Sequence, residues 1–168
     1  MKKYSVILIF LTLFACKNTA ISDASSSIKV NTVLDNWHKA AANADYKTYF
    51  DLMSDDAVFI GTDATENWNK KDFQAYAKPH FDKGKAWSFT TLERNLFFEK
   101  TGNIAWFDEL LETQMKICRG SGVLVKIKNE WKIKHYVLSM TIPNENSNQV
   151  IKIKTSEDFI IEKLKLKQ

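Results

Sequence analysis

Cysteine and histidine are scarce in this chain, which has two cysteines and three histidines among its 168 residues. Their positions match no metal-ligand spacing, so the sequence predicts no metal site and no cofactor. An excess of one charge is also lacking, because 24 Lys and Arg residues are balanced by 20 Asp and Glu residues. The basic residues are scattered and form no stripe with interleaved aromatic residues, which argues against a nucleic-acid partner.

A long hydrophobic run is missing as well, since the apolar segment near the N-terminus extends only from Val6 to Phe14. A membrane-spanning helix needs about 20 apolar residues, which disfavours a transmembrane anchor. Two lysines precede the segment, and Ala15 and Cys16 follow it. This arrangement resembles a bacterial lipoprotein signal, which implies that residues 1–15 are removed and that Cys16 carries a lipid. We therefore expect the protein in the bacterial cell envelope, anchored by lipid to a membrane on its periplasmic side or at the surface.

The segment behind the lipid is small and polar. Residues 16–27 include three consecutive serines and predict a flexible tether. With Cys16 lipidated, only Cys118 remains, so no disulfide can form within the domain. Cys118 lies in an alternating stretch, which predicts a buried side chain.

The hydrophobic period then changes along the chain from helical to alternating. Apolar residues at helical spacing predict helices over residues 28–43, 46–53 and 73–81, with a bend or restart at Pro79. Alternation predicts four long strands over residues 87–98, 104–118, 120–128 and 130–142, after a short strand at 57–60. Helices followed by antiparallel strands give an α+β fold, in which a curved sheet wraps around the N-terminal helices. Residues 144–168 predict a C-terminal helical extension, either docked on the domain or lying on a membrane surface.

Three motifs on the predicted strands occur in an order and at a spacing that resemble a known family. They are Ala105-Trp106-Phe107-Asp108-Glu109, Arg119-Gly120-Ser121-Gly122-Val123-Leu124-Val125-Lys126 and Trp131-Lys132-Ile133-Lys134-His135-Tyr136. The chain from about residue 30 to 143 thereby resembles the SnoaL-like branch of the nuclear-transport-factor-2-like (NTF2-like) superfamily, and we assign residues 28–143 to this domain. The resemblance implies a cone-shaped fold with a pocket between the helices and the concave side of the sheet. It also implies a homodimer, which we expect to form through the strand face that carries Tyr136, Leu138 and Met140.

Alternation on the last strand predicts which side chains enter that pocket. His135 and Ser139 share a face with Trp131, a side chain too large and apolar to be left exposed, so this face should look inward. Asp108 is the candidate catalytic base, with His135 as the second catalytic residue, because burial raises the pKa of a carboxyl group. The alternatives are that Glu109 points inward instead, or that either carboxylate merely pairs with Arg119.

The other candidate residues would contact a ligand. Aromatic-lined hollows with few polar groups are typical of small-molecule sites. We expect a small apolar ligand to be held by Phe59, Trp68, Trp106, Arg119 and Ser139. The remaining histidines are not expected to contact a ligand. His80 is expected in the core and His38 on the surface of a helix.

Three functions stay open at this point. The first is a membrane-tethered protein that binds a small apolar ligand. The second is an isomerase- or dehydratase-like enzyme that uses Asp108 and His135, which the lack of a clear acidic pair disfavours. The third is a non-catalytic module for association of two copies.

Overall fold

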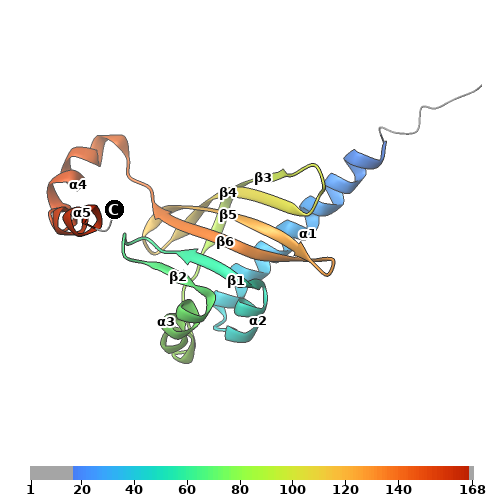
Figure 1. The fold of residues 1–168 in the computed structure, drawn as a ribbon, viewed down its shortest axis with the longest axis horizontal. Helices are drawn as coiled ribbons and strands as arrows, with labels where there is room; N and C mark the ends of the chain where they lie inside the picture. The colour runs from blue at the N-terminus through green and yellow to red at the C-terminus, as the bar shows by residue number, and fades with distance from the viewer. Residues whose placement is uncertain (1–16, 167–168) are drawn as a thin grey trace, which may run out of the picture.

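Helices cover one face of a six-stranded sheet in the computed structural model, which describes residues 17–166 (Figure 1). The strands lie in the order β2-β1-β6-β5-β4-β3, and β1 is parallel to β6 while the other neighbours are antiparallel. Their bounds are β1 Met53–Ile60, β2 Asn67–Asn69, β3 Thr90–Phe98, β4 Ile104–Thr113, β5 Lys116–Ile127 and β6 Glu130–Met140. This arrangement confirms the α+β fold with a curved sheet. We call the helix side of the sheet its covered face and the other side its open face.

The helices before the sheet are α1 (Lys17–Ala42), α2 (Tyr46–Asp51) and α3 (Lys70–Asp82). Asp45 caps α2 by accepting a hydrogen bond from the backbone N–H of Thr48. Helix α1 begins at Lys17, although the sequence predicted a flexible tether over residues 16–27. The segment contains neither proline nor glycine that would end a helix. Pro79 lies inside α3 without dividing it.

The core lies between the covered face and the three helices. Its largest fully buried side chains include Trp37 on α1, Tyr49 on α2, Phe73 on α3 and Tyr136 on β6. Cys118 is also buried, as predicted. The predicted boundary between the strands 104–118 and 120–128 is wrong, because β4 ends at Thr113 and β5 begins at Lys116.

A β-bulge on β6 reverses the alternation on which the pocket prediction depended. Leu124 pairs with Ile133 and Val123 pairs with His135, so Lys134 is an extra residue without a partner on β5. An extra residue moves all later side chains to the opposite face. The prediction that His135 faces the concave side is therefore wrong.

The same bulge changes the predicted dimer face. Tyr136 and Leu138 follow the extra residue and are buried in the core on the covered face, with exposures of 0% and 6%. Ser139 is exposed and pairs with Arg119 on the open face. The prediction that Ser139 looks into the pocket is wrong, and so is the prediction that Tyr136 and Leu138 form an intermolecular contact.

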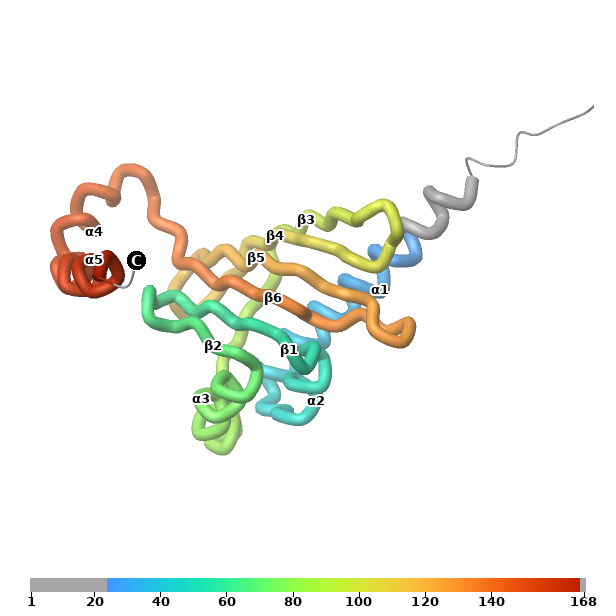
Figure 2. Tube along the Cα trace, viewed as in Figure 1, coloured from blue at the N-terminus to red at the C-terminus, as the bar shows by residue number. Residues whose placement is uncertain are grey.

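The C-terminal extension consists of a short 3₁₀ helix, Asn144–Asn146, followed by α4 (Ser147–Ile153) and α5 (Glu157–Lys165). Ile151, Ile153, Phe159 and Leu164 are all exposed, so these helices are not packed into the core. The trace in Figure 2 places them at the opposite end of the long axis from the first turns of α1 that are drawn in colour. Between residues 17 and 166 there is no helix that is long and apolar enough to cross a membrane.

Candidate functional site

An aromatic cavity lies between β1, α3 and the segment that leads into β3. It encloses about 240 Å³. Its aromatic lining consists of Phe59, Trp68, Phe73, Tyr76, Trp87 and Phe89. Phe59 stacks on Phe73 with ring centroids 4.0 Å apart, and Trp68 stacks on Tyr76 at 4.5 Å. These contacts hold several rings nearly parallel, so the lining of the cavity presents mainly aromatic surface.

Few polar side chains line this cavity. Glu66, His80 and Gln114 are the main ones. Glu66 is already engaged, since its carboxylate accepts a hydrogen bond from the backbone N–H of Asp63 (3.2 Å). His80 lies against the ring of Tyr76, with centroids 5.4 Å apart. The prediction that His80 lies in the core is wrong, because its side chain is half-buried and lines the cavity.

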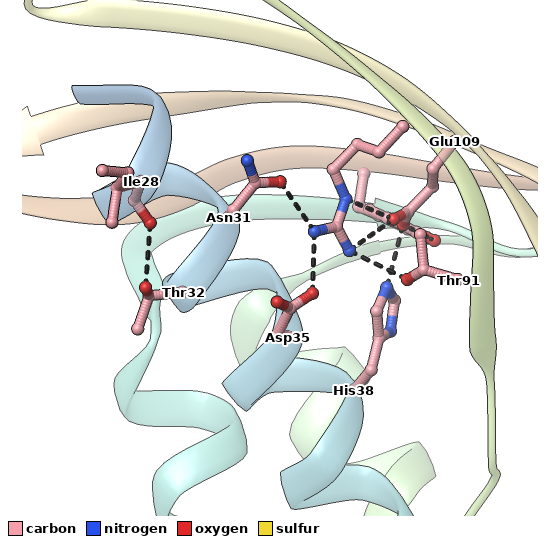
Figure 3. Close-up of polar contacts among 9 residues, drawn as sticks. Ile28, Asn31, Thr32, Asp35, His38, Thr91 and Glu109 are labelled. Carbon is pink, nitrogen blue, oxygen red and sulfur yellow. Dashed lines mark hydrogen bonds and ion pairs between the residues drawn. The ribbon is translucent and has the colours of Figure 1, made fainter. Parts of the chain in front are cut away.

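A buried polar network centres on Glu109, on the covered face of β4 (Figure 3). Its Oε1 accepts hydrogen bonds from Nε2 of His38 (2.9 Å) and from the hydroxyl of Tyr136 (3.0 Å). Its Oε2 accepts from Nε of Arg94 and pairs with Nη2 of the same side chain, both at 2.8 Å. Arg94 in turn donates to Asp35 and Asn31 on α1. The network therefore connects α1 to β3, β4 and β6.

The surroundings of Glu109 favour its ionised form. Burial alone would raise the pKa of the carboxyl group, but the hydrogen bond and electrostatic interaction with His38, together with the positive charge and hydrogen bond of Arg94, outweigh burial and hold the pKa below its usual value. Burial and the nearby Glu109 charge raise the pKa of Tyr136 well above its usual value, so its hydroxyl remains a donor. An ionised carboxylate accepts hydrogen bonds only, which fixes the direction of every bond in this cluster.

Gly120 makes room for the network. A Cβ atom at this position would lie 2.2 Å from the hydroxyl oxygen of Tyr136 and 3.0 Å from Cγ of Glu109. The absent side chain thus allows Tyr136 on β6 to reach across β5 to the carboxylate on β4.

The predicted site residues fall into two groups. Phe59 and Trp68 line the aromatic cavity. The others project from the open face and do not line the cavity; they are Trp106, Asp108, Arg119, His135 and Ser139. Cys16 lies outside the described residues.

Asp108 and His135 share the open face but are not paired. Asp108 is opposite Ser121, whereas His135 is opposite Val123 on the same strand. Asp108 accepts a hydrogen bond from Asn95 (3.2 Å). Glu109, which the sequence allowed as the alternative to Asp108, is the carboxylate that points inward. Its cationic partner is Arg94 and not Arg119.

Sequence reasoning missed His38. It was expected on the surface of a helix, but it is 5% exposed and bonded to Glu109. The available signal was its position four residues after Leu34, which places both on one side of α1. Arg94 carried no comparable signal, because its pairing with Glu109 depends on the register of β3 against β4.

The cone of helices against a curved sheet defines an NTF2-like fold. It is similar to an NTF2-like protein of unknown function from Pseudomonas putida, with a TM-score of 0.62 and 14% identity over 74% of this chain and 92% of that one. It is also similar to a protein named as a candidate scytalone dehydratase from Novosphingobium aromaticivorans, with a TM-score of 0.61 and 9% identity over 73% and 89% of the two chains.

A third similar structure is named as a candidate calcium/calmodulin-dependent kinase II association domain, from Exiguobacterium sibiricum. Its TM-score is 0.56, with 14% identity over 71% of this chain and 96% of that one. At these identities the likeness concerns the fold. The SnoaL-like domain model matches residues 30–143, and the chain belongs to this family. No curated protein matches the chain.

Proposed function

We propose that this chain is a membrane-tethered binding protein for a small, flat, apolar molecule. The observation that supports the proposal is the aromatic cavity, in which six rings surround about 240 Å³ with few polar side chains. Ligand sites for drug-sized molecules usually enclose about 300–1,000 Å³. The smaller volume here favours a ligand of one or two rings.

Naphthalene is a suitable first probe, and equilibrium dialysis against the purified protein measures its binding. Trp68→Ala should weaken binding roughly fivefold or more, because a stacked aromatic pair contributes about 1 kcal/mol. Trp106→Ala is the matched control, since Trp106 is a tryptophan on the open face and does not line the cavity. Failure of the wild-type protein to retain naphthalene, or equal losses in both variants, would contradict the proposal.

The tether in this proposal depends on Cys16 and on the signal-like segment before it. Stable anchoring by lipid takes more than one acyl chain, which the lipoprotein modification would supply. Cys16→Ser should prevent lipidation and release the protein from membranes, whereas Cys118→Ser should leave its fractionation unchanged. A Cys16→Ser protein that still sediments with membranes, uncleaved, would point to a transmembrane anchor.

A second proposal concerns association of two copies through the open face. Phe97, Ile104 and Trp106 are all between 41% and 45% exposed. Phe97 and Trp106 stack on each other at 5.8 Å across the adjacent strands β3 and β4. Monomeric proteins seldom expose large contiguous apolar surfaces, and a second copy of the same face would cover it by two-fold symmetry.

Light scattering of the purified protein tests this association. Wild type should have the mass of a dimer, and Phe97→Lys with Trp106→Lys should have the mass of a monomer with unchanged circular dichroism. Lys78→Glu, a charge change on α3, serves as the control. A wild-type monomer at high concentration would exclude the proposed dimer.

The enzymatic alternative lacks comparable support. A structural neighbour is named as a candidate dehydratase, but Asp108 and His135 lie on the open face, outside the cavity. Proton transfer needs both groups within hydrogen-bond reach of a bound substrate. The geometry therefore favours binding over catalysis by this pair.

A further inference from the structure

A second hollow lies beside the aromatic cavity, between α1 and the start of β3. This groove encloses about 290 Å³ and is lined by Asp35, His38, Lys39, Phe89, Thr90 and Thr91, with Ala42 at its side. Among the described residues, Phe89 is the only one that lines both the groove and the aromatic cavity. Phe89 is thus a wall between the two hollows.

Phe89 lies outside the helices and strands. It is half-buried and ends a stretch, residues 85–89, that belongs to no helix or strand. Its ring meets that of His38 edge-on, with centroids 5.9 Å apart. The position of this one side chain therefore bears on whether the aromatic cavity and the groove are separate or joined.

The polar end of the joined space is His38. Its Nε2 lies 2.9 Å from Oε1 of Glu109, and the side chain is 5% exposed. Because the ionised carboxylate only accepts, Nε2 must carry the hydrogen. In the neutral imidazole Nδ1 then carries the lone pair, and a ligand that reaches it must offer a hydrogen-bond donor.

We propose that Phe89 opens the aromatic cavity to Nδ1 of His38, and that the complete site binds an aromatic molecule with a hydroxyl group that donates a hydrogen bond to this nitrogen. This inference rests on the proposed binding function and names its ligand class, the phenols and other aryl alcohols. The apolar rings hold the aromatic body, and His38 selects for the hydroxyl group. Glu109 acts as a positioning residue, since it sets which nitrogen of His38 accepts.

Three probes of similar shape separate these contributions, namely 2-naphthol, naphthalene and 2-methoxynaphthalene. Equilibrium dialysis should show 2-naphthol bound roughly five- to tenfold more tightly than the other two, which is the range expected for one neutral hydrogen bond. The methoxy compound keeps the oxygen but lacks the donor, so it controls for polarity. Equal binding of all three to the wild-type protein would overturn the inference while leaving the proposed function intact, and binding of none would contradict the proposed function itself.

Two variants test which residues cause the preference for 2-naphthol. Phe89→Trp should close the passage and remove the preference, so that 2-naphthol and naphthalene bind with similar affinity to each other, and Phe97→Trp on the open face is its control. His38→Phe keeps an aromatic ring and removes the acceptor, so it should also remove the preference.

Nitrogen NMR of the wild-type imidazole does not depend on the stability of any variant. It should show a hydrogen on Nε2 and none on Nδ1. A hydrogen on Nδ1 of the neutral ring, or a preference for 2-naphthol that survives Phe89→Trp, would refute the inference.

Discussion

Asp108 and Glu109 are adjacent on β4 and carry the same chemical group, but the two faces of the sheet surround them differently. Glu109 lies on the covered face, is 1% exposed and is bonded to His38, Arg94 and Tyr136. Asp108 lies on the open face and accepts one bond from Asn95. The same contrast separates the buried stack of Phe59 on Phe73 from the half-exposed stack of Phe97 on Trp106. We therefore expect the contribution of a side chain to the free energy of unfolding to depend more on the face on which it lies than on its chemical type.

The largest difference between the faces should come from the two carboxylates. Glu109→Ala leaves the buried guanidinium of Arg94 and the hydroxyl of Tyr136 without their acceptor, and breaking a buried pair in this way costs about 3–5 kcal/mol. Asp108→Ala should change the free energy of unfolding by less than about 0.5 kcal/mol, as most surface substitutions do. Urea denaturation measures both values. Similar values for the two variants would mean that the network around Glu109 contributes little.

The two aromatic stacks should differ almost as much. Phe73→Ala removes a ring that is 1% exposed, and truncation of a core phenylalanine costs about 3–5 kcal/mol. Phe97→Ala removes a ring that is 45% exposed, so its cost in the monomer should stay near 1 kcal/mol or below. Thermal unfolding under identical conditions compares them. A loss of stability well above about 1 kcal/mol for Phe97→Ala would indicate that the open face is covered in solution, as it would be in the proposed dimer.

Gly120 gives a smaller effect of the same kind. Gly120→Ala would place a methyl group against Tyr136 and Glu109 on the covered face, and overpacking of this sort costs about 1–3 kcal/mol. Ser121→Ala, one residue later on the opposite face, is the control and should be nearly neutral. Chemical denaturation of both variants is the measurement, and a neutral Gly120→Ala would show that the network can shift to admit a methyl group.

The smallest expected difference is in the dependence of stability on pH. The folded state lowers the pKa of Glu109, so the unfolded state binds a proton more readily. The resulting stabilisation is present above the unfolded value of about 4.3 and is lost as the pH falls through the lower folded value. Denaturation between pH 6 and 3 should therefore show a decline that Glu109→Gln reduces and Asp108→Asn leaves unchanged. The reverse pattern would mean that Asp108 is the stabilising carboxylate.

Much of the fold could be predicted from local patterns. Helical spacing of Val30, Leu34 and Trp37 predicted the buried side of α1, and the change to a period of two predicted the meander of long strands. Both predictions agree with the structure because each depends only on residues within the same helix or strand.

The site could not be predicted in the same way. The bulge at Lys134 is a property of the register between β6 and its neighbours, and alternation within one strand carries no sign of it. It moved His135 and Ser139 from the expected pocket to the open face. Glu109 and His38 meet across 71 positions of the chain, so only the assembled fold brings them together.

The length of α1 has a mechanical consequence. Among the residues of α1 from position 24 onward, whose exposure is described, the first fully buried one is Val30, and the thirteen residues from Lys17 to Lys29 span about 20 Å at 1.5 Å per residue. If Cys16 carries the proposed lipid, this part of the helix would act as a rigid spacer and not as a flexible linker. The spacer would hold the sheet clear of the lipid headgroups, and Figure 1 places its free end at the opposite end of the long axis from α4 and α5. Such a protein would take its ligand from the surrounding water, at a fixed height above the membrane.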